Sequence, residues 1–339
     1  MNKIVLVTGG AGYVGSHTCL ALAEAGFLPV VYDDLSNGHR DFVQWGPFEH
    51  GDIRDGARLD AVFARHRPSA VLHFAAQIEV GESVKAPHLF YDINVGGALS
   101  VIGAAQRAQV KTFVFSSTCA TFGAPIAMPM DESHPQAPLN PYGQSKLMVE
   151  RILLDLDRYA GFRSAILRYF NAGGADPLGR VGERHEPETH AIPLAIQAAL
   201  GRRPAFKIFG QDYDTPDGTA VRDYVHVLDL ADAHVAALRR LLDGGGTEAF
   251  NLGQGDGVSV RQLVSAISAE SERPFSVEMH ERREGDAPIL VADSRKARAM
   301  LGWTPSRSLQ DIVQTAFAWH RKEYAGEAPA VLVGAADRR

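Results

Sequence analysis

Short apolar runs alternate with longer amphipathic stretches through the first half of the chain. The apolar runs lie at residues 3–8, 28–32, 48–52, 70–75, 112–116 and 164–169, and we expect each to form a strand. Helical periodicity appears at residues 18–25, 57–65, 88–108 and 142–159. Strands that alternate with helices of this length predict a doubly wound α/β fold, in which a parallel sheet carries helices on both faces.

The second half of the chain predicts a smaller α/β domain that binds substrate. Helices are expected at residues 193–200, 227–242, 260–268 and 309–321, with a short strand at residues 250–252. We therefore expect a first domain at residues 1–171, a second domain at residues 172–324 and a frayed tail at residues 325–339. Residues 173–190 form a long connection rich in glycine, proline and charge, which favours an active-site loop over a disordered linker.

A glycine-rich turn separates the first expected strand from its helix. Gly9, Gly12 and Gly15 permit a tight turn, a close approach of the backbone to a pyrophosphate, and free N–H groups at a helix start. The second expected strand ends at Asp33, where a carboxylate can accept the ribose hydroxyls of an adenosine. A glycine cluster alone could be only a loop, but this spacing predicts a Rossmann dinucleotide site. Asp33 favours NAD over NADP, although Arg40 follows seven residues later and would suit a 2′-phosphate.

The carboxyl ends of the expected strands bring polar and small residues to one edge of the sheet. Ligands of doubly wound sheets bind outside that edge. Besides the glycine turn, the residues there are Asp33, Asp52, Ile53, Phe74, Ala75, Ala76, Ser116, Ser117, Thr118, Tyr169, Phe170 and Asn171. We expect this edge to hold the ligand, while ordinary strand-end hydrogen bonding is the alternative for the three hydroxyl residues at 116–118.

Tyr142 and Lys146 stand four residues apart in a stretch that begins at Pro141, and proline suits the first position of a helix. Both side chains then share one helix face. A free tyrosine ionises near pH ~10, and a neighbouring ammonium would pull its pKa down toward use as a base or acid. Most such pairs are merely solvated, so the setting decides. Thr118 follows the fifth expected strand, and its hydroxyl could meet the phenol and the ammonium where a nicotinamide would lie.

Composition limits the partners. The 339 residues are 45% apolar and 22% charged, as in a globular protein, and a net charge of −6 offers no basic surface for nucleic acid or anionic lipid. The two cysteines are too few for a disulfide framework, and the 13 histidines show no ligand spacing, so we expect no metal site. No apolar stretch approaches the roughly 20 residues of a spanning helix and no secretory leader is evident, so we expect a cytoplasmic protein with a small-molecule partner.

Two signatures make the chain resemble the extended short-chain dehydrogenase/reductase superfamily. They are Thr8-Gly9-Gly10-Ala11-Gly12-Tyr13-Val14-Gly15 and Tyr142-Gly143-Gln144-Ser145-Lys146. Within it the chain is similar to the UDP-glucose 4-epimerase family, over about residues 3–322. The closer likeness is carried by Asp33-Asp34-Leu35-Ser36-Asn37, Gly51-Asp52-Ile53-Arg54, His73-Phe74-Ala75-Ala76, Val80-Gly81-Glu82-Ser83-Val84, Leu167-Arg168-Tyr169-Phe170-Asn171, Ile208-Phe209-Gly210, Val221-Arg222-Asp223-Tyr224-Val225-His226-Val227 and Arg282-Arg283-Glu284-Gly285-Asp286.

The resemblance implies an NAD-dependent isomerase that interconverts UDP-galactose and UDP-glucose. C4 of the sugar would pass a hydride to tightly bound NAD, and the resulting 4-keto sugar would turn over and regain the hydride on its other face. Tyr142 would take the O4 proton, Lys146 would hold the phenolate and the nicotinamide ribose, and Thr118 would hydrogen bond O4. The resemblance also implies a homodimer through helices 88–108 and 142–159, and a return of residues 221–242 to the first domain.

The resemblance further implies which residues contact the ligands. The cofactor contacts would be Gly9, Gly12, Tyr13, Val14, Gly15, Asp33, Asn37, Asp52, Ile53, Phe74, Ala75, Ala76, Asn94, Ser116, Tyr142, Lys146 and Tyr169. The substrate contacts would be Thr118, Asn171, His190, Ala191, Lys207, Phe209, Arg222, Tyr224, Arg283, Asp286 and Leu290.

Three positions depart from the family pattern. Thr118 stands where many relatives have serine, and it keeps the hydroxyl while its β-methyl restricts χ1. Ile78 replaces a lysine that some relatives place near the cofactor. Leu290 stands where relatives have tyrosine or a small residue that gates N-acetylated sugars, so UDP-N-acetylhexosamines stay open as substrates.

The same residues allow three alternative functions to be evaluated. Residues 116–121 also resemble UDP-xylose and UDP-arabinose 4-epimerases, so a pentose substrate is an alternative. Sugar-nucleotide 4,6-dehydration needs a carboxylate pair after Thr118, where Cys119 and Ala120 stand instead, so it is disfavoured. A dinucleotide-binding protein without catalysis ranks last, since such members commonly lose the tyrosine or the lysine.

Overall fold

A seven-stranded parallel sheet forms the centre of the molecule. The computed structural model describes residues 3–271, 273–283 and 286–325. The strand order is β11-β6-β5-β4-β1-β2-β3, and every neighbouring pair is parallel. The strands are β1 (Ile4–Thr8), β2 (Leu28–Asp33), β3 (Phe48–His50), β4 (Ala70–His73), β5 (Thr112–Thr118), β6 (Arg163–Tyr169) and β11 (Glu248–Leu252). The order reverses between β1 and β4, which creates the crevice where ligands of such sheets bind.

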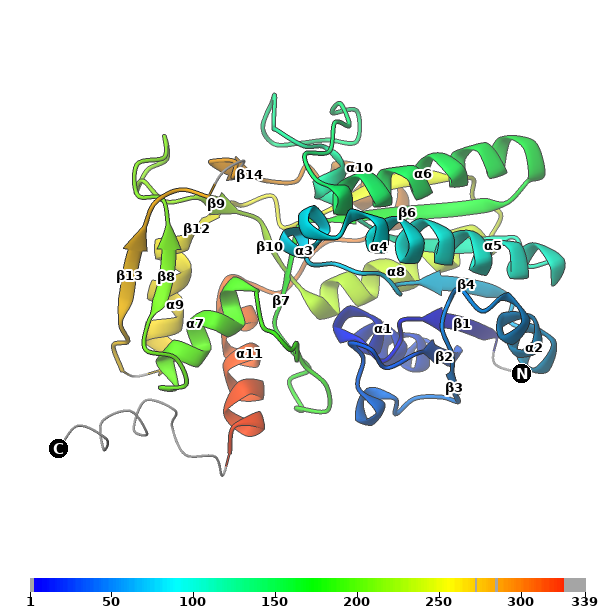
Figure 1. The fold of residues 1–339 in the computed structure, drawn as a ribbon, viewed down its shortest axis with the longest axis horizontal. Helices are drawn as coiled ribbons and strands as arrows, with labels where there is room; N and C mark the ends of the chain where they lie inside the picture. The colour runs from blue at the N-terminus through cyan, green and yellow to red at the C-terminus, as the bar shows by residue number, and fades with distance from the viewer. Residues whose placement is uncertain (1–2, 272, 284–285, 326–339) are drawn as a thin grey trace.

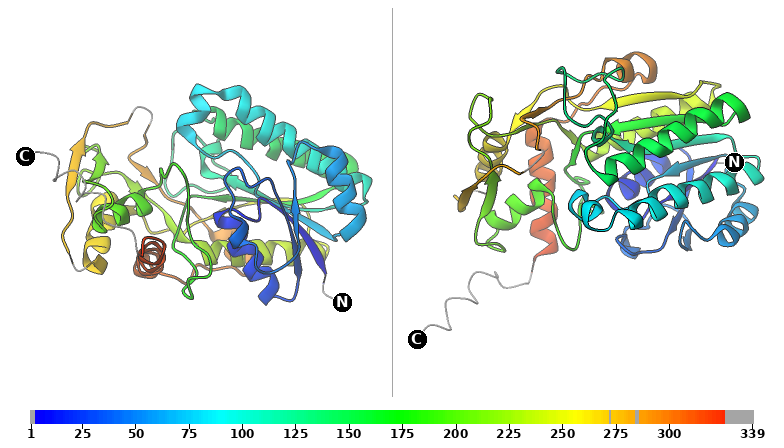
Figure 2. Two further views of the ribbon diagram at one scale, coloured as in Figure 1. Left: turned by 60° about the horizontal axis from the view of Figure 1, so that its bottom comes forward. Right: turned by 45° about the horizontal axis from the view of Figure 1, so that its top comes forward.

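Helices cover both faces of this sheet (Figures 1 and 2). One face carries α1 (Tyr13–Glu24) and α8 (Val227–Leu242), and the other carries α2 (Gly56–His66), α5 (Ala98–Arg107) and α6 (Pro141–Ala160). The short helices α3 (Val80–Lys85) and α4 (Pro87–Phe90) pack beside α6. The predicted doubly wound α/β fold is therefore confirmed.

Successive residues of β1 show why its sequence is apolar throughout rather than alternating. Val5 and Val7 pack into the core beneath α1 and α8, whereas Leu6 packs into the core beneath α2 and α5. All three side chains are completely buried. Side chains of a strand point alternately to opposite faces, so a sheet covered on both faces needs apolar residues at every position.

Two predicted helices differ from the structure. The first begins at Tyr13 rather than residue 18, because its first turn is formed by the glycine-rich segment, which carries no apolar periodicity. The stretch predicted as one helix at residues 88–108 is α4, a π-helical segment (Tyr91–Gly97) and α5 in succession. Apolar spacing does not distinguish a wider helical turn from an α-helical one, and π-helical turns are frequent at functional sites.

The second domain surrounds a separate core. Its helices are α7 (Ala191–Ala199), α9 (Val260–Ser271) and α11 (Leu309–Glu323). Their apolar faces meet in one cluster that includes Ile196, Leu263 and Phe317. Small sheets complete this domain. In one of them β13 (Val277–His280) pairs with β8 (Phe206–Phe209), and in another β9 (Val221–Arg222) lies between β12 (Val258–Ser259) and β14 (Ile289–Leu290). A further sheet pairs β10 (Tyr224–His226) with β7 (Asn171–Gly173).

The chain crosses back to the first domain for longer than the predicted return at residues 221–242. α8 packs on α1, and β11 then pairs with β6 as the outermost strand of the large sheet. α10 (Arg295–Leu301) follows against β11. β9 stays with the small sheet of the second domain, so the segment that lies against the first domain starts after β9 and extends beyond residue 242 to α10. A four-residue or five-residue apolar run shows that a strand forms but not which sheet it joins.

No helix among the described residues is long and apolar enough to span a bilayer. Of the predicted tail at residues 325–339, all but residue 325 lie outside the described residues.

Candidate active site

The glycine turn after β1 forms a tight backbone cradle at the crevice. Gly9 has a φ of +73°, and a Cβ there would lie 2.4 Å from the backbone nitrogen of Ala75, in the segment after β4. A Cβ on Gly15 would lie 2.2 Å from the carbonyl oxygen of Gly9. A Cβ on Gly12 would have one neighbour within 4 Å among the described residues, apart from the residues next to it in the chain. That neighbour is the carbonyl oxygen of Gly9, 3.4 Å away. Gly9 and Gly15 thus close the turn, and its face at Gly12 is open to a ligand at the start of α1.

Asp33 ends β2 beside this cradle. Its carboxylate accepts hydrogen bonds from the N–H groups of Ala11, at 3.0 Å, and Leu35, at 2.9 Å. Burial raises the pKa of Asp33, and the two N–H donors oppose that rise. A Cβ on Gly38 would lie 2.7 Å from the carboxylate, so the glycine lets the following loop close over it. An open turn at a helix N-terminus with a fixed carboxylate beside it fits the pyrophosphate and the adenosine ribose of NAD.

Four further predicted cofactor contacts follow the glycine turn, β2 and β3 along the chain. Asn37 is exposed and Val14 is partly exposed. Asp52 forms an ion pair of 2.5 Å with Arg54, whose hydrogen bond lowers the pKa of the carboxyl. Ile53 is buried against Gly97 of the π-helical segment.

The segment after β4 packs directly against the end of β1 and the glycine turn. The N–H groups of Phe74 and Ala75 both donate to the carbonyl of Thr8, at 2.9 and 3.1 Å. The ring of Phe74 packs against His234 with ring centres 4.7 Å apart, and Ala76 is half-buried. Tyr13 is buried, and its hydroxyl donates to the carbonyl of a glycine in the loop after β7.

The helix that carries the predicted tyrosine and lysine starts as its sequence suggests. Pro141 occupies the first turn of α6, and the side chain of Asn140 caps the helix by accepting the N–H of Gly143 at 2.9 Å. A Cβ on Gly143 would lie 2.4 Å from the carbonyl oxygen of Ala120. Glycine therefore allows α6 to begin against the segment that follows β5.

This close approach brings the predicted catalytic residues together. The Thr118 hydroxyl, at the end of β5, lies close enough to the Tyr142 phenol to lower its pKa. Lys146 is buried and donates from its ammonium to the carbonyl oxygen of Ser116 at 2.9 Å. One turn of helix and one strand end thus place a phenol, a hydroxyl and an ammonium at the same edge of the sheet.

The expected lowering of the Tyr142 pKa by Lys146 was wrong for this structure. Burial raises the pKa of Tyr142 well above its usual range, the nearby Tyr169 raises it further, and the hydrogen bond with Thr118 lowers it. Burial also lowers the pKa of Lys146 to about 7, against the pull of Glu150. The physical reason is that desolvation penalises the charged form of both groups more than their spacing favours it.

Two side chains brace the catalytic helix from neighbouring elements. Asn94, in the π-helical segment, accepts from the N–H of Gln77 at 2.8 Å and donates to the hydroxyl of Ser145 at 2.9 Å. The phenol of Tyr169, on β6, hydrogen bonds the hydroxyl of Ser116. Asn94 and Tyr169 were predicted as cofactor contacts, and in the structure both bond to residues of the catalytic elements.

A buried charge network under the site was missed by sequence reasoning. Glu150, on α6, accepts from Arg168 on β6 at 2.6 Å, from the hydroxyl of Ser117 at 2.5 Å and from Gln136 at 2.8 Å. Glu150 and Arg168 are almost fully buried. A Glu four residues after a Lys on one helix face was the available signal, but its partner lies on another strand.

The predicted substrate residues meet on the second domain. The Arg222 guanidinium forms an ion pair of 2.5 Å with Asp286 and donates to the carbonyl of Ala287 at 2.9 Å. Leu290 pairs with Arg222 across β14 and β9 and packs on a cluster that includes Phe170. The predicted substrate contacts Arg222, Asp286 and Leu290 are therefore neighbours.

The other predicted substrate residues are spread more widely. Phe209 carries the Arg283 guanidinium 3.9 Å over its ring centre. Asn171 and Ala191 are half-buried, and Lys207 is exposed. His190 is the N-cap residue of α7, and its ring hydrogen bonds Glu183 rather than the helix. Tyr224 is buried in the core of the second domain, a position that favours packing over ligand contact.

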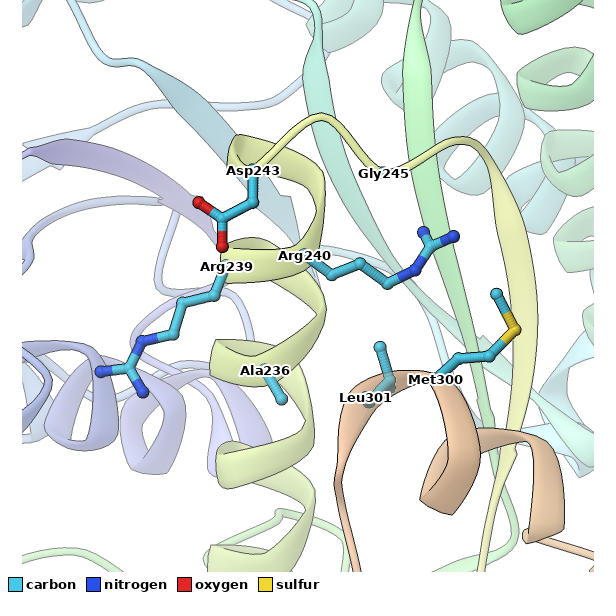
Figure 3. Close-up of a pocket in the computed structure, with 7 residues that line it drawn as sticks. All are labelled: Ala236, Arg239, Arg240, Asp243, Gly245, Met300 and Leu301. Carbon is cyan, nitrogen blue, oxygen red and sulfur yellow. The ribbon is translucent and has the colours of Figure 1, made fainter.

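A surface hollow of about 520 Å³ lies away from this site (Figure 3). Its wall is formed by Arg239 and Arg240 at the end of α8 and by Met300 of α10. None of the predicted ligand contacts lines it, and in Figure 3 the two arginines point to different sides. The hollow is therefore separate from the glycine turn and from the Tyr142 centre.

A parallel sheet with a glycine turn at its switch point and a Tyr–Lys helix beside it defines a dinucleotide-dependent enzyme of the short-chain dehydrogenase/reductase type. The chain belongs to the NAD dependent epimerase/dehydratase family, whose model matches residues 5–253. It is similar to the UDP-glucose 4-epimerase of Rhizobium leguminosarum bv. trifolii, with 62% identity over 321 residues that cover 95% of this chain and 98% of the relative. NAD is accordingly its cofactor.

Solved structures give the same result. The UDP-glucose 4-epimerase of Brucella ovis in complex with NAD superposes with a TM-score of 0.92 at 48% identity, over 94% of this chain and 98% of that one. The enzyme of Stenotrophomonas maltophila, solved with NAD and formylated UDP-arabinopyranose, has a TM-score of 0.93 at 38% identity, over 95% and 99% of the two chains.

Proposed function

We propose that this protein interconverts UDP-galactose and UDP-glucose by inverting C4 of the sugar. The observation that carries the proposal is the meeting of Tyr142, Thr118 and Lys146 at the carboxyl end of β5, next to the open glycine turn. The near full-length relatives named as UDP-glucose 4-epimerases support the same reaction.

Tyr142, Thr118 and Lys146 have different roles in the transfer of the sugar O4 proton. Tyr142 removes the proton of the sugar O4 and later returns it, and Thr118, whose hydroxyl lies beside that phenol, hydrogen bonds O4. Lys146, fixed on the carbonyl of Ser116, supplies positive charge beside the phenolate. When bound, NAD supplies a hydride acceptor and donor for C4 and the positive charge of an oxidised nicotinamide. Inversion then requires the 4-keto sugar to present its second face.

The nucleotide end of the substrate must stay bound while the sugar turns. Arg222 is the best-placed cation for the diphosphate, because its side chain is largely buried and its guanidinium is held on Asp286 and a backbone carbonyl. Phe209 and Arg283 form a stacked surface suited to a planar uracil. Asn171, His190, Ala191 and Lys207 remain predicted contacts of the wider pocket.

Leu290 and two of the solved relatives bear on whether the protein also accepts UDP-N-acetylhexosamines and UDP-pentoses. A solved relative from Campylobacter jejuni is a UDP-Glc/GlcNAc 4-epimerase, and the Stenotrophomonas maltophila enzyme holds a UDP-arabinopyranose derivative. Leu290 packs beside Phe170 and fills part of the space next to Arg222, which favours UDP-hexoses over the bulkier UDP-N-acetylhexosamines. UDP-pentoses, which lack the C6 group, fit the same space as slower substrates.

A homodimer in the cytoplasm completes the proposal. Exposed apolar side chains gather on the helices that cover one face of the sheet. They are Val80, Val84, Leu89, Leu99, Met148, Leu154 and Tyr159. The helical run before α5 packs against α6, so these side chains offer one apolar surface that a second copy of the chain would cover. Leu154→Glu should give a monomer in light scattering, whereas Leu178→Glu, at an exposed leucine elsewhere, should leave the dimer intact.

The reaction is tested by a product assay of the purified protein. UDP-galactose, UDP-N-acetylgalactosamine and UDP-arabinose are incubated in parallel, without added nucleotide and then with NAD⁺. Formation of UDP-glucose without net NADH supports epimerisation, and Thr118→Ser should retain it while Thr118→Val should not. Absence of turnover with all three sugars, in protein shown to contain NAD, would reject the proposal.

A further inference from the structure

Four potential metal ligands gather in the loop before α7. Glu183, His185, Glu188 and His190, which we call the His–Glu cluster, each offer one ligand atom, and these four atoms lie within 4.8 Å of one another. The loop belongs to the connection that sequence analysis assigned to the active site. The spacing of the four residues follows neither a helix nor a strand, which is why no metal site was expected from the sequence.

The distances within the cluster resemble those between the ligands of a metal ion. Nδ1 of His185 lies 3.5 Å from Glu183 and 3.6 Å from Glu188, and Nδ1 of His190 lies 4.0 Å from Glu188. Ligand atoms of a tetrahedral zinc site, with metal–ligand distances of about 2.0–2.2 Å, are about 3.3–3.6 Å apart. The shortest contact, 2.5 Å between His190 and Glu183, would have to open by about 1 Å.

Burial gives the cluster a need for positive charge. The side chains of Glu183 and Glu188 are only 3% and 6% exposed. Two carboxylates held out of water require a cation between or beside them. Nδ1 of His185 is buried and forms no hydrogen bond within the described residues, although it faces both carboxylates. An uncommitted ring nitrogen between two buried carboxylates is the arrangement that a metal ion completes.

The backbone around the cluster is fixed by contacts that do not involve the four ligand atoms. The indole N–H of Trp319, on α11, donates to the carbonyl of Glu183 at 2.9 Å, and its ring packs on Gly182. Arg184 forms ion pairs with Glu323 of α11 and with Asp41 of the first domain. The loop is thereby clamped between both domains, so the ligands are held in place before any ion binds.

We infer that the His–Glu cluster binds one divalent transition-metal ion, with Zn²⁺ the best fit. Two imidazoles and two carboxylates are a nitrogen and oxygen set that suits zinc, whereas magnesium prefers an all-oxygen octahedron. The ion would tie the start of α7 to the loop and so to the first domain. The ring of Tyr13, in the glycine turn, lies edge-on to His185 with ring centres 6.3 Å apart, so the site also supports the cofactor cradle.

The test measures zinc binding to the full-length, NAD-containing protein. The protein is stripped with a chelator, exchanged into metal-free buffer and titrated with ZnCl₂ in a calorimeter, and metal content is measured by elemental analysis. We expect one zinc per chain in the wild type and a loss of affinity of roughly 10–100-fold or more in Glu188→Gln and in His185→Gln. Glu186→Gln is the matched control, because Glu186 is an exposed glutamate of the same loop outside the cluster. MgCl₂ should produce no comparable binding.

A second measurement distinguishes loss of zinc binding from misfolding of the variants. Zinc should raise the melting temperature of the wild type and of Glu186→Gln but not that of Glu188→Gln, while all three chains melt cooperatively without zinc. Absence of stoichiometric zinc in the wild type, or equal zinc affinity in the wild type and Glu188→Gln, would overturn the inference. Equal binding of magnesium would do so as well, since the nitrogen ligands would then have no role.

Discussion

The ammonium of Lys146 donates a 2.9 Å hydrogen bond to the backbone carbonyl of Ser116, from one turn inside α6 to the end of β5. Lys146 also lies 5.0 Å over the ring centre of Phe115 and is almost fully buried. The lysine is thus a tether between the catalytic helix and the sheet as well as a charge beside the tyrosine. Its pKa falls because burial disfavours the charged form more than these contacts favour it.

The buried lysine should make stability depend on pH. Burial lowers the pKa of Lys146 from 10.5 to about 7, so between these values the unfolded chain binds more protons than the folded chain. Stability from this group is therefore fully present above pH 10.5 and is lost as the pH falls through 7. In urea unfolding, the wild type should gain up to about 1.4 kcal/mol per pH unit relative to Lys146→Met between pH 7 and 9. Parallel pH profiles of the two proteins would contradict the lowered pKa.

Replacing Tyr142 by phenylalanine should separate catalysis from binding. The variant lacks only the hydroxyl that exchanges a proton with O4, so kcat should fall by about 10²–10⁴-fold while the bound NAD and the KM change little. Coupled assays with UDP-galactose, together with the NAD content of the purified variant, measure both quantities. Wild-type kcat in Tyr142→Phe would remove the tyrosine from its assigned role.

Asp33→Ala should weaken NAD binding without changing the sugar pocket. The carboxylate sits at the end of β2 with two N–H donors, and the loss of its charge-assisted contacts to the ribose should cost about 1.5–3 kcal/mol, or roughly 10–100-fold in NAD affinity. NAD retained after gel filtration, and the concentration of added NAD that restores activity, report the change. Asp34→Ala removes an exposed neighbouring carboxylate and should bind NAD as the wild type does. The same retention in both variants would argue against Asp33 as the ribose contact.

Arg168→Met should strongly destabilise the fold. It leaves Glu150 as a buried charge without its cation, which costs about 3–5 kcal/mol in the free energy of unfolding. Arg151→Met, on the exposed side of the same helix, should change stability little. Urea titrations of the three proteins measure the difference. Equal stability of the two variants would mean that water reaches Glu150.

The predictable part of the site is local in sequence. Gly9, Gly12 and Gly15 act through the conformation of one turn, and Asp33 ends the next strand, so chain order and the rule for parallel sheets placed them together. Tyr142 and Lys146 needed only the period of a helix whose start Pro141 and Asn140 mark. Such relations require no knowledge of long-range packing.

Other relations depend on contacts between distant segments. Arg222 and Asp286 are 64 residues apart, and their ion pair forms because β14 pairs with β9. The raised pKa of Tyr142 and the lowered pKa of Lys146 follow from burial in the packed chain. The His–Glu cluster lies in an irregular loop that Trp319 and Arg184 hold in place.

The sequence by itself determined the alternation of strands and helices, the glycine turn with its carboxylate, and the Tyr–Lys helix, because short-range periodicity and turn chemistry encode them. Only the tertiary structure decided that β11 joins the large sheet, that Lys146 is tethered to Ser116, and that two glutamates and two histidines converge before α7. Burial and the pairing of distant strands set these features, and both are properties of the packed chain as a whole.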